Sequence, residues 1–171
     1  MKIELNSITG NNKAQILKWK SDPILANEIM SEFKIVTENE VESWIKLNSN
    51  DKNQVLKGIY YTTENKKTIV GVVRLMFIDF ESKNAELGIY IGDSNARGKG
   101  IGKKALELII KLGFKELKLN KIYLKVNSKN ENAIKLYLNT GFIIEGKLED
   151  HYYNTGTNMY EDIICMALFN S

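Results

Sequence analysis

The chain has 171 residues, 43% of them hydrophobic and 26% charged, and a formal net charge of +3. These are ordinary values for a single globular domain, and so small a charge, without a basic stripe interleaved with aromatic residues, gives no reason to expect nucleic acid as a partner. The longest apolar run, Ile69 to Phe80, contains Arg74 and Asp79 and is too short to span a membrane.

The cysteine content and the first residues favour a reducing, cytoplasmic setting. Cys165 is the only cysteine, so it cannot form an internal disulfide, and its apolar neighbours favour a core position. Residues 1–5 lack the apolar core of a signal peptide. The sequence contains no cluster of His, Cys or Asp with metal-ligand spacing, so no metal is expected.

The residue pattern of the first third of the chain predicts one short strand followed by helices. Residues 2–6 alternate between apolar and polar side chains, and residues 12–20 carry a helical pattern. Asp22-Pro23 breaks that pattern and restarts a helix towards Met30. The capping box Thr37–Glu40 then opens a further helix with apolar residues three or four apart.

The remaining chain alternates strands with helices. A polar turn joins the β-rich segments 55–63 and 68–78, and a third strand, 85–91, precedes an amphipathic helix that runs to about Leu117. The later elements are a strand, a helix and two strands, at 121–126, 130–139, 142–147 and 159–168. The order β-α-α-β-β-β-α-β-α-β-β predicts one α/β domain over residues 1–171, with a mixed sheet of about seven strands flanked by helices.

The most informative segment is Arg97-Gly98-Lys99-Gly100-Ile101-Gly102, between the third strand and the amphipathic helix. Alternating glycines let backbone N–H groups approach an anion, and the helix dipole favours negative charge there. The spacing excludes a P-loop, because Arg97 stands where that loop requires glycine. It also excludes the dinucleotide fingerprint, which needs a small residue where Lys103 stands.

A second motif lies in residues 130–142, which read Asn-x-x-Ala-x-x-Leu-Tyr-x-x-x-Gly-Phe. In this order the two motifs resemble those of the acetyl-CoA-dependent N-acetyltransferases of the GNAT superfamily. The resemblance is strong from Ile69 onwards and loose over residues 1–50. It is nearest to the branch that holds spermidine N-acetyltransferases and RimJ/RimL-type ribosomal-protein acetyltransferases. The segment Trp19–Pro23 is also similar to enzymes that acetylate nucleotide-linked aminosugars.

The resemblance implies a GNAT fold, with a sheet splayed at the cofactor site, and acetyl-CoA as co-substrate. Backbone groups of Ile89 and Ile91 would align the pantetheine. The pyrophosphate would be cradled by the glycine loop, that is by Arg97, Gly98, Lys99, Gly100, Ile101 and Gly102. Lys103 would reach a phosphate or remain a plain surface lysine. Asn130 would hydrogen-bond the cofactor, cap its own helix, or do both.

Two residues are candidates for the acid–base chemistry. Tyr137 matches the family's tyrosine, and a phenol with a pKa near ~10 is protonated at neutral pH and can donate to a departing thiolate. Its alternative role is packing, since Ala133 lies on the same helix face. Glu86 is the candidate base, because a primary amine is almost wholly protonated at pH 7; its alternative role is structural.

The acceptor is expected between the early helices and the hairpin near residues 152–160. The segment Ser21–Ile45 holds six acidic residues and one basic residue. It would suit a small polycationic amine held by Glu28 and Glu32, unless it is only a solvated helix face. The open alternatives are a protein N-terminus, an aminosugar nucleotide, or a CoA-sensing domain without turnover. Edge strands would allow a homodimer or a higher homo-oligomer.

Overall fold

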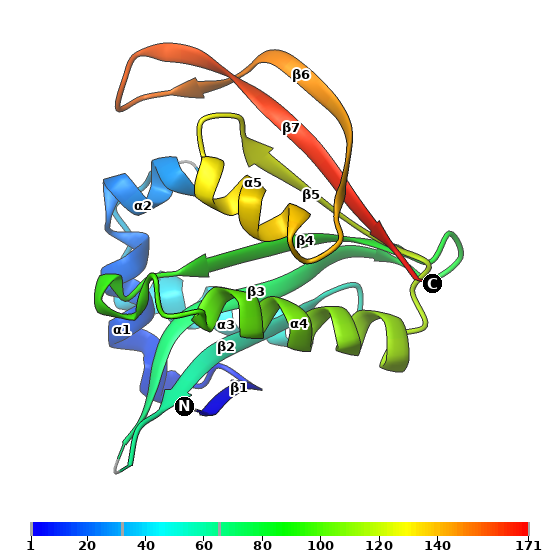
Figure 1. Cartoon of the computed structure of the whole chain (residues 1–171). Helices are drawn as coiled ribbons and strands as arrows, with labels where there is room; N and C mark the ends of the chain where they lie inside the picture. The colour runs from blue at the N-terminus through cyan, green and yellow to red at the C-terminus, as the bar shows by residue number, and fades with distance from the viewer. Residues whose placement is uncertain (1, 32, 65, 171) are drawn as a thin grey trace.

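The computed structural model describes residues 2–31, 33–64 and 66–170. Over these residues seven strands form one sheet in the order β1-β2-β3-β4-β5-β7-β6 (Figure 1). Their bounds are β1 Lys2–Asn6, β2 Val55–Thr62, β3 Lys67–Asp79, β4 Asn84–Ile91, β5 Lys121–Asn127, β6 Ile143–Asn154 and β7 Met159–Phe169. Neighbouring strands are antiparallel except β4 and β5, which run parallel because a helix crosses over between them.

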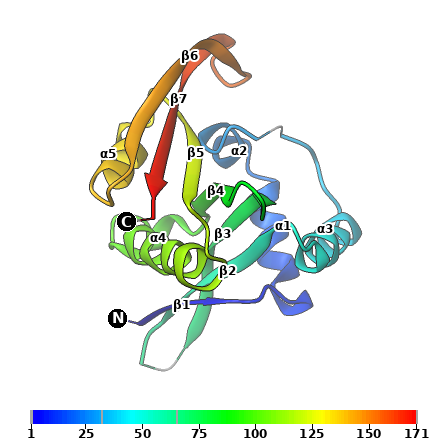
Figure 2. The same cartoon turned by 90° about the vertical axis from the view of Figure 1, so that its right-hand side faces the viewer.

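Helices cover both faces of this sheet (Figure 2). Their bounds are α1 Lys13–Lys20, α2 Pro23–Glu28, α3 Glu38–Asn50, α4 Ile101–Lys111 and α5 Glu131–Leu138. The buried residues of α4 and α5 belong to one apolar cluster on the sheet. Those of α1 and α3, together with Leu25 of α2, belong to a second cluster. None of the helices in the described ranges is long and apolar enough to cross a membrane.

The predicted mixed sheet of about seven strands is confirmed, with three local differences. Three helices separate β1 from β2, whereas the predicted element order counted the helical stretches on either side of Asp22-Pro23 as one. The long helix leaves the α-helical pattern at Lys111, before a π-turn containing Gly113, where an added Cβ would lie 2.8 Å from Ile122 Cδ1. Strand β6 continues to Asn154, because β7 pairs with it again beyond a bulge between Leu148 and Tyr152.

The sheet is splayed between its two parallel strands, as expected. Strand β4 pairs with β5 only from Asn84 to Glu86. Beyond that point β4 stays paired with β3 as far as Ile91, while β5 stays paired with β7 as far as Asn127. The carboxyl ends of β4 and β5 therefore separate, and their facing edges leave room for a ligand.

Candidate active site

Two cavities meet where β4 and β5 separate. The first, called here the loop cavity, measures about 890 Å³ and lies against the glycine loop and α5. The second, the strand cavity, measures about 740 Å³ and lies against α1, β3 and β4. Seven described residues line both: Leu25, Ile29, Met30, Ile89, Tyr90, Lys125 and Tyr137. Two ligands can therefore approach one another at a shared wall.

The glycine loop has the backbone geometry of an anion site. Gly98 and Gly100 have φ angles of +72° and +75°, in the left-handed region that glycine enters without penalty. Gly100 is also the N-cap of α4 and supplies no capping side chain. The first N–H groups of α4 thus lack a side-chain partner and, with the helix dipole, favour a negatively charged group.

Most of the residues expected to hold a cofactor line the loop cavity; Lys99 does not. Those that do are Ile89, Ile91, Arg97, Gly98, Gly100, Ile101, Gly102, Lys103 and Asn130. The Asn130 side-chain oxygen accepts a hydrogen bond of 3.1 Å from the Ala133 N–H, as the N-cap of α5. Its capping role and its place in the cavity therefore hold together.

Arg97 is tied to its surroundings through its guanidinium. Its Nε donates to the Ile91 carbonyl at 3.0 Å. Its two terminal nitrogens lie 3.2 and 3.0 Å from the two carboxylate oxygens of Glu28. Glu28 lines the loop cavity and not the strand cavity. The carboxylate of Glu28 thus pairs with the phosphate-loop arginine, and an acceptor-binding role for Glu28 stays a prediction.

The other acids of the early segment are also engaged away from the strand cavity. Glu38 and Glu42 lie 3.3 and 3.4 Å from the Lys13 ammonium. Glu40 closes the predicted capping box with Thr37, and Asp22 caps α2. Glu32 lies outside the described residues. Hence none of the described acids of residues 21–45 lines the strand cavity.

Tyr137 stands in the wall shared by the two cavities. It is 8% exposed, and its ring packs against that of Phe142 with centroids 5.7 Å apart. Burial raises the pKa of its phenol to about 12. Within the described residues its hydroxyl makes no hydrogen bond. The side chain therefore both packs, as its alternative role required, and presents a protonated hydroxyl where the two cavities join.

Glu86 faces the strand cavity from β4. Its neighbours Ala85 and Leu87 point to the opposite face, where they belong to the core. Glu86 is half-buried and stands opposite Met76 of β3. Its carboxylate lies in the same cavity wall as Tyr137, so the two candidate acid–base residues border one space.

The sequence reading missed two groups of residues. Lys20, Arg74 and Lys125 line the strand cavity. The signal for Arg74 was a charge in an otherwise apolar strand.

In the loop cavity the buried Glu161 accepts hydrogen bonds from Asn127, Lys129 and Asn154, and the Lys129 bond is the largest cause of its lowered pKa. Glu161 lies on β7, while Asn127 and Asn154 come from β5 and β6 and Lys129 from the loop after β5, so no local spacing joins the four residues.

Comparisons with known proteins place the chain in a family. Residues 2–143 match the model of the acetyltransferase (GNAT) domain. Spermidine N(1)-acetyltransferase of Escherichia coli K12 is 36% identical over 99 residues, 58% of this chain and 52% of that enzyme. Acetyltransferase PseH of Campylobacter jejuni is 28% identical over 154 residues, 88% of this chain and 91% of that protein. The alignments with the spermidine acetyltransferases span 52–63% of their length.

The fold has a solved counterpart. Spermidine N-acetyltransferase from Vibrio cholerae, crystallised with CoA and spermine, superposes with a TM-score of 0.89 at 23% identity, over 98% of this chain and 95% of that chain. The family match covers most of the chain and agrees with the splayed sheet and the glycine loop. The chain belongs to the GNAT acetyltransferase family.

Proposed function

We propose that this protein transfers an acetyl group from acetyl-CoA directly to a primary amine. The position of Tyr137 carries the proposal, because one protonated hydroxyl borders both a cavity with an anion loop and a separate cavity beside a carboxylate. Direct transfer requires the two substrates to be held together in a reactive orientation, and two cavities with a common wall provide this.

The loop cavity fits acetyl-CoA. The N–H groups of the glycine loop, the N-terminus of α4 and Lys103 would hold the phosphates. The edge of β4 at Ile89 and Ile91 has no β5 partner and would bind the amide-containing arm. When bound, acetyl-CoA supplies an acyl group activated as a thioester.

Glu86 would take the proton that the amine must lose before it attacks. An amine with a pKa of about 10.4 is neutral in only about one molecule in 2,500 at pH 7, a deficit of roughly 4.6 kcal/mol. A carboxylate in the acceptor cavity can accept that proton, directly or through water. Tyr137 keeps its own proton throughout the neutral range, so it can give it to the sulfur as the thiolate departs.

The identity of the amine has two candidates. A polyamine draws support from the activities named for the Escherichia coli and Vibrio cholerae relatives. The described acids of residues 21–45 add no support for a polyamine, because they form ion pairs or helix caps outside the strand cavity. The amine of a nucleotide-linked sugar is the second candidate, and the basic side chains around the strand cavity favour it.

The test is CoA release by the purified protein with spermidine, spermine, an Ala-starting peptide and a UDP-linked aminosugar, followed by intact-mass measurement of the protein. We expect an acetylated amine when the amine is present and no acetylated protein when it is omitted. A stable acetyl-protein that then passes its acetyl group to the amine would contradict direct transfer. Acetyl-CoA binding without release to any amine would favour the sensing domain.

A further inference from the structure

We infer that the amine acetylated by this protein also carries a negatively charged group, which Arg74 and Lys20 bind in the strand cavity. This inference rests on the proposed acetyl transfer and names the class of its acceptor. The charged group is an oxyanion, either a phosphate or a carboxylate.

The charges that line the strand cavity favour an anion. Its basic residues include Lys20, Arg74 and Lys125, and Glu86 is the one acid among the described residues of its lining. A polyamine would bring several positive charges into this cationic space, where like charges repel. An oxyanion would reduce the excess of positive charge.

Arg74 has unused hydrogen-bond donors. It lies on β3 opposite Gly88 of β4, and a Cβ added to Gly88 would stand 3.5 Å from Arg74 Nε. The half-buried side chain therefore lies close to Gly88 of β4. Nothing in the described part of the chain hydrogen-bonds or ion-pairs with its guanidinium. Burial lowers the pKa of Arg74 more than the nearby Tyr90 and Glu86 raise it, so its charge is poorly solvated.

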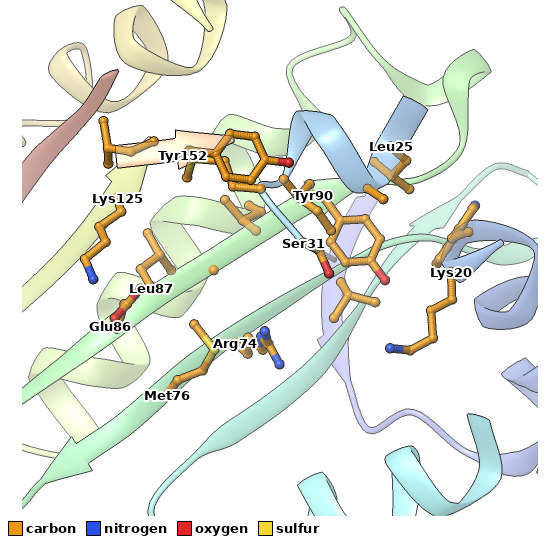
Figure 3. A pocket seen from close by; sticks show the side chains of 18 of the residues that line it. Lys20, Leu25, Ser31, Arg74, Met76, Glu86, Leu87, Tyr90, Lys125 and Tyr152 are labelled. Carbon is orange, nitrogen blue, oxygen red and sulfur yellow. The ribbon is translucent and has the colours of Figure 1, made fainter. Parts of the chain in front are cut away.

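Lys20 is the second cation of this site. Its ammonium lies 4.2 Å from the centre of the Trp44 ring, and within the described ranges it has no carboxylate partner. Its pKa is lowered first by burial and then by the charge of Arg74, so the two cations are near enough to repel. Figure 3 shows Lys20, Arg74 and the Tyr90 hydroxyl around one part of the cavity, with Glu86 and Lys125 at the other. An oxyanion between Lys20 and Arg74 would relieve their repulsion and accept from both.

The site lies at a suitable distance from the proposed chemistry. Gly88, beneath the Arg74 side chain, is two residues from Glu86 on the same face of β4, about 7 Å along the strand. An acceptor of a few bonds' length can therefore place its amine beside Glu86 and Tyr137 and its oxyanion beside Arg74. A cavity of about 740 Å³ also accommodates ligands as large as a nucleotide-linked sugar.

The test compares amines that differ in their charged group. Glucosamine 6-phosphate is set against glucosamine, with spermidine, L-glutamate and a UDP-linked aminosugar as further arms. We expect at least a tenfold higher kcat/KM for an anionic amine than for spermidine. Comparing the phosphate-bearing amines with L-glutamate shows whether the bound oxyanion is a phosphate or a carboxylate. Arg74→Gln and Lys20→Gln should each raise KM for that amine at least tenfold, and Arg74→Lys should restore part of the loss. Lys18→Gln, an exposed change on the same helix, is the matched control.

A binding measurement does not depend on turnover. With CoA saturating, UDP or L-glutamate should raise the Tm of the wild-type protein and of Lys18→Gln, and the rise should disappear in Arg74→Gln. If no amine is acetylated but the rise depends on Arg74, the proposed transfer fails and the anion site stands. If spermidine is the preferred acceptor, or if neither anion gives a rise that depends on Arg74, the inference is overturned while acetyl transfer remains.

Discussion

Arg74 and Gly88 stand opposite each other on β3 and β4, and the side chain of Arg74 lies within contact distance of a Cβ added at Gly88. A Cβ at position 88 would lie 3.5 Å from Arg74 Nε and 3.3 Å from Met76 Cε. A side chain at position 88 would therefore stand beside the Arg74 guanidinium in the strand cavity.

Gly88→Ala is expected to raise KM for the acceptor severalfold while leaving KM for acetyl-CoA close to that of the wild type. The added methyl would crowd Met76 Cε and would touch Arg74 at an ordinary contact distance, and both of these residues line the strand cavity and not the loop cavity. Steady-state kinetics with each substrate varied in turn measure the effect. Gly146→Ala is the control, since a Cβ there meets nothing within 4 Å. Equal changes in both KM values would contradict the separate roles of the two cavities.

Gly98→Ala and Gly100→Ala are each expected to raise KM for acetyl-CoA at least tenfold and to destabilise the fold by about 1–2 kcal/mol. Both residues have positive φ but open space around them, so the cost is backbone strain and not a clash. Denaturant unfolding and initial rates check the two effects. Gly10→Ala, also in open space but without positive φ, is the control. An unchanged KM would remove the loop from the cofactor site.

Glu28→Gln is expected to lower KM for acetyl-CoA and to leave KM for the acceptor unchanged. The substitution removes a negative charge beside the loop and frees the Arg97 guanidinium to face phosphate. Glu42→Gln, which weakens a pair with Lys13 outside both cavities, is the control. A raised KM for the acceptor alone would contradict this expectation and would support the acceptor role that the sequence predicted for Glu28.

The Tyr137 phenol is expected to titrate near pH 12. Because its folded pKa is raised above the ordinary value of 10.0, the stability that it contributes is full below about pH 10 and is lost as the pH rises towards 12. Alkaline titration of phenolate absorbance, with the Tyr137→Phe curve subtracted, isolates this group. Titration of the difference curve near pH 10 would mean that the hydroxyl is not buried.

The sequence predicted those parts of the site that lie on contiguous motifs. The loop from Arg97 to Gly102 and the helix that carries Tyr137 each have a spacing that local geometry dictates. The predicted order of strands also places the loop and this helix beside the cavities. The capping box at Thr37 was likewise a local pattern, and it is present in the structure.

The acceptor side could not be predicted in the same way. Arg74 and Lys20 come together only because α1 packs beside β3, and no spacing in the sequence relates them. Glu28 looked like part of an acidic surface, but it pairs with Arg97, 69 residues further along the chain. Strand β6 was predicted too short because its second half is held by pairing with β7 and not by its own apolar pattern.

The central claim is that Tyr137 acts at the junction of the two substrates. Its most direct test is the kcat for acetyl transfer to the best amine, compared between Tyr137→Phe and Tyr153→Phe, a tyrosine outside both cavities. We predict a loss of at least a hundredfold for Tyr137→Phe, with both KM values near those of the wild type and no loss for Tyr153→Phe. Equal kcat values for the two variants would contradict it and leave Tyr137 a packing residue.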